Sequence, residues 1–155
     1  EYTLPGISQS VVITRMAGRT PVPEKESVRS FAAHQATMVL FLSTGLLKEL
    51  SAELIEGGYN EDTPAAIVYK ATWPDQKVLR CTVGTLEQTA READVTKTAL
   101  IVVGEVLDGT YERSKLYDPT VTTEFRQATC SKKELGQTGE NQSTEMRREA
   151  EGQSK

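Results

Sequence analysis

The sequence predicts an α/β fold, in which a mixed β-sheet is flanked by helices. Four short runs of β-branched or apolar residues, at positions 10–15, 37–42, 65–70 and 98–103, are typical of strands. Helically spaced apolar residues lie between the first and second of these runs, and again between the second and third. Because strands and helices alternate, we expect the helices to pack against one sheet.

The segment around Trp73 makes the predicted sheet a mixed one. Residues 77–82 alternate polar and apolar side chains and follow the 65–70 strand after a short loop that contains Pro74. This is a direct passage from strand to strand, without a helix between them. We expect Trp73 itself to be partly buried in the core, the commoner position for tryptophan; the alternative is that it covers one face of a ligand.

Three helices are expected. The first begins near Glu24, because Pro23 suits a helix start and acidic residues favour the amino-terminal end of the helix dipole. The second covers residues 46–56 and ends at two glycines. The third covers residues 85–93, with Thr85 as its expected N-cap. The apolar positions expected to face the core are Val28, Phe31 and Ala32 in the first helix, and Leu46, Leu47, Leu50 and Leu54 in the second.

Composition excludes several classes of function. The 155 residues carry a net charge of −4, so nothing predicts a global attraction to nucleic acid or to anionic lipid. No apolar run has the length of a membrane span, and no signal peptide is recognisable. Cys81, Cys130 and the lone His34 fit no metal or redox spacing. We therefore expect no metal site, and reduced thiols in a cytoplasmic protein.

The chain divides into three stretches by composition. Residues 1–9 are expected to form a linker, and residues 10–126 the folded domain. Residues 127–155 have almost no large apolar side chains, so they bury too little surface to offset chain entropy, and we expect them to be disordered. The first residue is Glu1 rather than methionine, and a fragment of a longer protein is the favoured interpretation.

The residues themselves give two hints of chemistry and no nucleophile elbow, P-loop or dinucleotide fingerprint. Arg15 and Arg19 lie on a loop rich in glycine and proline next to a strand end. Because a guanidinium group can bind a carboxylate through two hydrogen bonds, this loop could bind a ligand with several carboxylates. The alternative is that both arginines are ordinary surface charges. The loops that begin at residues 42, 70 and 103 follow apolar strands, which is where α/β sheets usually bind ligands.

Three motifs make the resemblance to a known family specific. They are TRMAGRTPVPE at residues 14–24, YKATWPDQ at 69–76 and YERSKLYD at 111–118. In this order they resemble the precorrin-4 C(11)-methyltransferases, including the cobalt-precorrin-4 enzymes, a branch of the tetrapyrrole methylase family. The resemblance covers about residues 2–126. It implies that this chain is the second of two α/β domains, and that the first domain, with its glycine-rich loop, is absent.

The resemblance also implies a cofactor site. S-adenosylmethionine would bind between the two domains, largely through backbone atoms of the second. The corresponding positions are Leu42 after one apolar strand, the loop residues Tyr69, Lys70 and Ala71, and Ala99, Leu100 and Ile101 on the last strand. Methyl transfer to a ring carbon needs alignment and desolvation more than an acid or base, so no catalytic residue is assigned.

The implied substrate is precorrin-4 or cobalt-precorrin-4, a macrocycle that carries several carboxylates. Arg15, Arg19 and Lys115 are therefore the expected substrate-binding residues, and a homodimer is the implied assembly. Two alternatives stay open. One is that the chain is a non-catalytic α/β binding module. The other is that it is part of a methyltransferase that acts on another precorrin ring carbon.

Overall fold

The computed structural model describes residues 3–108, 122, 124 and 127. The helices and strands of this described part lie in the first of two compact units, Glu1–Glu112; the second is Arg113–Lys155. The strands are β1 (Val11–Arg15), β2 (Thr37–Phe41), β3 (Pro64–Tyr69), β4 (Lys77–Thr82) and β5 (Ala99–Val103), and the α-helices are α1 (Val28–Ala32), α2 (Leu47–Gly57) and α3 (Leu86–Glu92). The predicted linker, domain boundary and disordered tail stay predictions.

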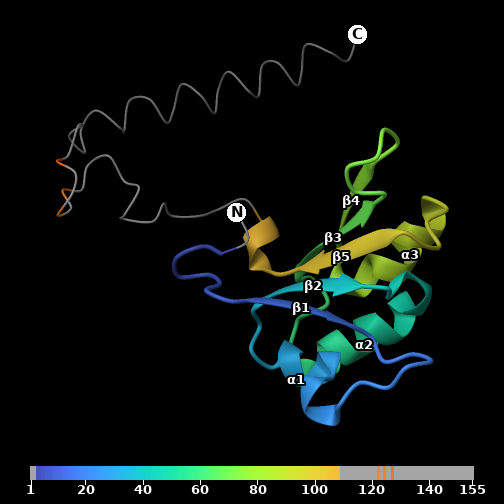
Figure 1. Cartoon of the computed structure of the whole chain (residues 1–155), viewed down its shortest axis with the longest axis horizontal. Coiled ribbons are helices and arrows are strands. Elements are labelled where there is room, and N and C mark those ends of the chain that lie inside the picture. Colours follow the sequence, from blue (N-terminus) through green and yellow to red (C-terminus); the bar gives the residue numbers. More distant parts are fainter. Residues whose placement is uncertain (1–2, 109–121, 123, 125–126, 128–155) are drawn as a thin grey trace, which may run out of the picture. The chain divides into compact units, whose positions relative to one another are not determined.

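The five strands form one mixed sheet in the order β1-β2-β5-β3-β4 (Figure 1). β1 and β2 are parallel, whereas β5 is antiparallel to both of its neighbours and β3 is antiparallel to β4. The last of the described strands, β5, therefore lies in the middle of the sheet. The predicted α/β class with a mixed sheet is confirmed, including the direct passage from β3 to β4.

The core lies between one face of this sheet and the three helices. Alternate residues of the inner strands point into it, and helix side chains meet them there. The completely buried members are Ala32, Met38, Leu40, Leu50, Leu54, Ile67, Val83, Leu86, Ile101 and Val103. Figure 1 shows α1, α2 and α3 lying together along the sheet. Because successive strand side chains point to opposite faces of a sheet, Met38, Leu40, Ile67, Ile101 and Val103 all point toward the helices.

The opposite face carries no helix in the part of the chain that the structure describes. It presents Ile13, Val68 and Val78, which are exposed or half-buried. After β5 the chain turns toward this face through a 3₁₀ turn, Glu105–Leu107, and the Arg80 guanidinium donates a hydrogen bond of 3.0 Å to the Leu107 carbonyl.

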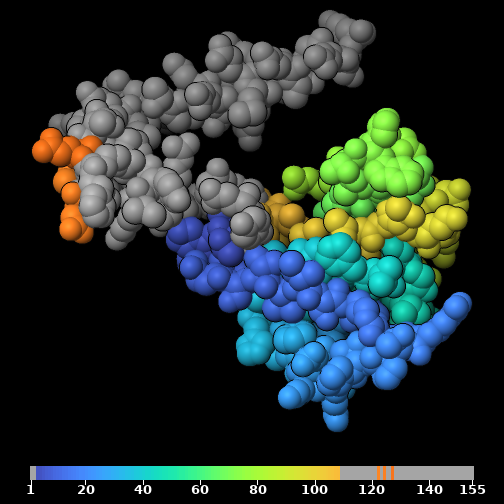
Figure 2. Space-filling model, in the orientation of Figure 1, coloured from blue at the N-terminus to red at the C-terminus, as the bar shows by residue number. Residues whose placement is uncertain are grey.

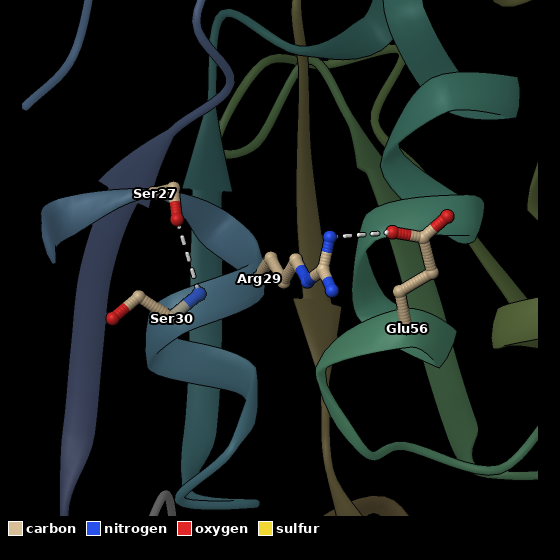
Figure 3. A network of polar contacts seen from close by, with 4 residues as sticks. All are labelled: Ser27, Arg29, Ser30 and Glu56. Atoms are coloured by element: carbon tan, nitrogen blue, oxygen red, sulfur yellow. Dashed lines mark hydrogen bonds and ion pairs between the residues drawn. The ribbon is translucent and has the colours of Figure 1, made fainter. Parts of the chain in front are cut away.

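The first helical region differs from the prediction of one helix from Glu24. A 3₁₀ turn, Glu24–Glu26, comes first, and the backbone is then extended at Ser27 (φ −62°, ψ 155°) before α1 begins. The Ser27 hydroxyl accepts a hydrogen bond of 3.1 Å from the Ser30 amide, so Ser27 is the N-cap (Figure 3). In the same view Arg29 forms a 3.0 Å ion pair with Glu56 of α2.

Two other details of the helices differ from expectation. Thr85 precedes α3 as predicted, but its hydroxyl does not cap that helix. It accepts instead from the Thr82 amide at 3.0 Å, closing the preceding 3₁₀ turn, Val83–Thr85. Leu46 lies in another 3₁₀ turn, Thr44–Leu46, before α2 and is half-buried, because the helix starts one residue later than predicted.

A close approach of α1 and α2 generates a stability prediction. A Cβ added to Gly57 would lie 2.4 Å from the Ala32 Cβ and 2.6 Å from the Arg29 carbonyl oxygen. Gly57→Ala should therefore lower the free energy of unfolding by about 1–3 kcal/mol through overpacking. Gly45→Ala is the matched control, since its Cβ meets nothing within 4 Å. Urea unfolding measures both; equal stabilities would show that the helices do not pack this closely.

Candidate functional site

The carboxyl ends of β1, β2 and β3 meet at one edge of the sheet, together with the amino end of β5. This follows from the strand directions, because β1 and β2 are parallel and β5 is antiparallel to both β2 and β3. Loops that leave the carboxyl ends of strands are where open α/β sheets bind ligands. A ligand site is therefore expected at this end of the sheet.

A pocket of about 270 Å³ opens there between the ends of β2, β3 and β5. Its lining residues come from three loops and strand ends that are distant in sequence. They are Phe41, Leu42, Thr44, Val68, Lys70, Ala71, Trp73, Thr98, Ala99 and Leu100. Five of the seven predicted cofactor residues are thus brought together at one pocket: Leu42, Lys70, Ala71, Ala99 and Leu100. Their roles stay predictions.

The other two predicted cofactor residues lie differently. The Ile101 side chain is completely buried in the core beneath the sheet, so only its backbone faces β2 and β3. Tyr69 is half-buried and packs against the core, while its ring lies under the Lys70 ammonium, 5.1 Å from the ring centroid. Neither residue is among those that line the pocket.

The backbone around the pocket is held in a left-handed conformation that non-glycine residues rarely adopt. Leu42 (φ 53°) follows β2, Lys70 (φ 47°) and Thr72 (φ 71°) follow β3, and Thr98 (φ 58°) precedes β5. These are four of the six non-glycine residues with positive φ in the described chain, so such strain concentrates at this edge. Backbone strain of this kind is characteristic of ligand sites. The predicted strand at 37–42 consequently ends at Phe41.

The β3–β4 turn carries a charged and aromatic cluster. The Lys70 ammonium contacts the Asp75 carboxylate and lies 5.4 Å from the centroid of the Trp73 ring. The hydrogen bond to Asp75 raises the pKa of Lys70, and the same bond lowers the pKa of Asp75. Trp73 is exposed, so the expectation of a core tryptophan is wrong. The β3–β4 turn projects away from the sheet and its helices (Figures 1 and 2).

Ser43 is a residue that sequence reasoning missed. It is completely buried, its hydroxyl accepts a hydrogen bond of 3.0 Å from the Met16 amide, and it donates one of 2.7 Å to the Phe41 carbonyl. Ser43 thereby ties the loop after β1 to the end of β2. A small polar residue directly after a buried strand was the available signal. Next to it, the Thr44 hydroxyl donates to the Ala99 carbonyl at 3.4 Å.

The two predicted arginines occupy different situations. The Arg15 guanidinium donates to the carbonyls of Met16 and Thr20, each at 3.1 Å, and of Pro21 at 3.2 Å. Arg15 therefore shapes its own loop. Arg19 lies on that loop and is exposed. Lys115, the third predicted substrate residue, lies outside the described residues.

The described residues contain no group of three or more His, Cys, Asp or Glu side chains arranged to hold a metal ion. Among them there is also no helix with the length and apolar character needed to cross a bilayer. Cys81 is a free thiol, and burial raises its pKa.

Comparison with known proteins agrees with this geometry. Residues 1–87 match the family model of the tetrapyrrole (corrin/porphyrin) methylases, and the chain belongs to that family. Among its relatives, the cobalt-precorrin-4 C(11)-methyltransferase of Methanocaldococcus jannaschii is 49% identical over 129 residues, 83% of this chain and 50% of that protein. The enzyme of the same name from Priestia megaterium is 46% identical over 135 residues, 84% of this chain and 52% of the relative. The chain spans about half the length of the curated relatives it matches.

Two solved structures share this fold, and the first is also similar in sequence. A cobalt precorrin-4 methyltransferase, described as a cobalamin biosynthetic enzyme, superposes with a TM-score of 0.65 and 47% identity, covering 67% of this chain and 44% of that one. A uroporphyrin-III C-methyltransferase from Thermus thermophilus, complexed with S-adenyl homocysteine, shares the fold at 20% identity and a TM-score of 0.58, over 73% of this chain and 47% of that one.

The left-handed backbone at Leu42 predicts that stability depends on which residue is placed there. Leu42→Asn should raise the free energy of unfolding by about 0.5–1 kcal/mol, because asparagine tolerates this conformation and the leucine side chain is barely buried. Leu42→Val, at the same position, should lower it by about 1 kcal/mol, since β-branched residues resist positive φ. Urea unfolding of the unmodified chain and the two variants measures these differences. Identical midpoints would mean that the backbone is unstrained at this position.

Proposed function

We propose that this chain is part of an S-adenosylmethionine-dependent methyltransferase that methylates carbon 11 of precorrin-4 or cobalt-precorrin-4 in cobalamin biosynthesis. The observation that carries the proposal is the identity of 46–49% to cobalt-precorrin-4 C(11)-methyltransferases over more than four fifths of the chain. The pocket at the strand ends supports it, because it brings together five positions at which this family is expected to contact its methyl donor.

The pocket fits part of such a donor. Half-buried Val68, Ala99 and Leu100 offer an apolar surface suited to an adenine ring, and the small Ala71 lets the backbone approach closely. Its volume of about 270 Å³ lies just below the roughly 300–1,000 Å³ usual for small-molecule sites. We infer that the rest of the site comes from a region homologous to the unmatched half of the relatives. A homodimer and a cytoplasmic location belong to the same proposal.

The proposed reaction requires these residues to align the methyl donor with the ring carbon that it methylates. When bound, the donor would supply a methyl group on a sulfonium; a nucleophilic ring carbon would attack the methyl carbon as the carbon–sulfur bond breaks and S-adenosylhomocysteine leaves. The strained turns at Leu42 and Lys70 hold the pocket backbone in place, and the apolar lining excludes water from the reacting centre. No proton transfer by a side chain is required for this displacement, so the proposal needs no acid–base pair among the pocket residues.

Binding of S-adenosylhomocysteine tests the cofactor site directly. We would titrate it calorimetrically into this chain, and into a hybrid in which the unmatched half of the Methanocaldococcus jannaschii relative is joined ahead of Glu1. Tight binding is expected in the hybrid alone. Ala71→Leu in the hybrid should weaken it at least about tenfold by filling the pocket. Ala52→Leu, on the exposed side of α2, is the matched control. Binding to neither protein would favour the non-catalytic module.

The arginine loop is the proposed anchor for substrate carboxylates. Arg15 supports it by bonding three carbonyls of the loop, which leaves the exposed Arg19 as the better candidate for direct contact. Arg19→Ala in the hybrid should raise KM for precorrin-4 about five- to tenfold, the loss of one charge-assisted contact. Arg91→Ala on α3 is the control. An unchanged KM and turnover would remove Arg19 from the site.

A further inference from the structure

Large apolar side chains are exposed preferentially at the rim of the strand-end pocket. In the described chain six such side chains are exposed, and Phe41 (43%), Leu42 (87%) and Trp73 (56%) all line this one pocket. The remaining three, Ile7, Ile13 and Val78, lie elsewhere on the unit and line no part of it. A contiguous exposed apolar surface beside a pocket marks a place where a ligand or partner is bound.

Trp73 is exposed and yet held in place. Its amide donates to the Lys70 carbonyl at 3.0 Å, and its carbonyl accepts from the Gln76 amide, also at 3.0 Å. The Gln76 side chain accepts in turn from the Thr72 amide at 2.6 Å, which closes the turn from within. A backbone bonded on both sides of the residue limits where the indole can move. The exposed ring is therefore built into the turn.

The ammonium of Lys70 adds a second restraint on the indole. It lies 5.4 Å from the ring centroid, within the range of a cation–π contact, and it is paired with Asp75. Because Asp75 already satisfies its charge, Lys70 serves less as a free partner for an anion than as a support that orients Trp73. Asp75 and Lys70 are therefore positioning residues for the tryptophan.

The exposed apolar rim extends beyond the pocket, which favours the tetrapyrrole, the larger of the two ligands in the proposed reaction, as its occupant. The pocket of about 270 Å³ has its half-buried apolar wall at Val68, Ala99 and Leu100, which suffices for the adenine end of a methyl donor. Trp73, 56% exposed, extends this apolar surface at the pocket rim. A conjugated macrocycle is wide enough to reach from the pocket across the indole, and aromatic surfaces bind one another in offset stacks.

We propose that Trp73, oriented by Lys70 and Asp75, is the stacking surface that binds the conjugated ring of the tetrapyrrole substrate, with Phe41 continuing the apolar platform. The inference rests on the proposed function, since it assigns the substrate side of the same site. It separates the two ligands in space: backbone and small residues hold the methyl donor, and the exposed rim holds the macrocycle.

The first test uses the chain as it stands, because Trp73 is its only tryptophan and reports on its own surroundings. Uroporphyrin, a stable polycarboxylate tetrapyrrole, is the probe, and quenching of Trp73 emission is the signal. Saturable quenching is expected, with a weaker apparent affinity in Asp75→Asn, in which the time-resolved anisotropy of Trp73 should also fall. Quenching that never saturates would overturn the proposal.

The second test separates substrate binding from cofactor binding in the hybrid protein. Trp73→Ala should weaken uroporphyrin binding about tenfold or more, the scale of a lost aromatic stack, while Trp73→Phe largely restores it. Affinity for S-adenosylhomocysteine should stay within about twofold in both variants. The matched control is Val78→Ala. Val78 lies on β4, and its apolar side chain is also exposed (54%), so the substitution should change neither affinity.

The outcomes distinguish this inference from the proposed function. If Trp73→Ala behaves like Val78→Ala, or lowers both affinities equally, Trp73 is not a surface for the macrocycle. If the unmodified hybrid fails to bind S-adenosylhomocysteine, the proposed function fails instead, and uroporphyrin binding by the chain still decides the role of Trp73. Selective loss of uroporphyrin binding with intact cofactor affinity supports both.

Discussion

The insertion of β5 between β2 and β3 is the constraint on which the rest of this structure depends. Ile101 of β5 pairs with Leu40 on one side and Ile67 on the other, so β5 is the backbone pairing partner of both β2 and β3. All three side chains are completely buried on the helix-covered face. In the described residues, the β1–β2 pair and the β3–β4 pair are thus joined through β5 alone.

The same insertion creates the pocket. β5 enters at Thr98 and Ala99, directly between the turn after β2 and the turn after β3. Three chain segments meet there, and each bends sharply, with Leu42, Lys70 and Thr98 in left-handed conformations. Such conformations cost free energy, and they persist because the packed strands behind them leave the chain no alternative path. The strain and the pocket therefore have one cause.

A rigid strand-end pocket suits the proposed chemistry. Direct displacement at a methyl group depends on holding two partners in line, and strand ends locked by a packed core move little. Ser43 extends this rigidity to the arginine loop, since its buried hydroxyl joins the Met16 amide to the Phe41 carbonyl. The turn that bears Trp73 projects further, so the fold combines the proposed donor pocket with an outlying aromatic surface.

Much of the fold could be predicted from the sequence, because its signals are local. The continuous apolar runs at 37–42, 65–70 and 98–103 indicate strands. The helical spacing of the leucines in α2 indicates a helix. Five of the proposed cofactor positions were expected from the resemblance to the family, and all five line one pocket. Caps were less predictable: Thr85 bonds to Thr82 rather than capping α3, because neighbouring 3₁₀ geometry offered its hydroxyl a different donor.

By itself the sequence determined the fold class, the positions of the elements and the family, since each depends on residue types near one another along the chain. Tertiary structure alone decided that β5 lies in the middle of the sheet, that Ser43 bonds the Met16 amide and that Trp73 is exposed. These outcomes depend on which distant segments meet. Local hydrophobic periodicity carries no information about that choice, because it specifies a buried face without naming what covers it.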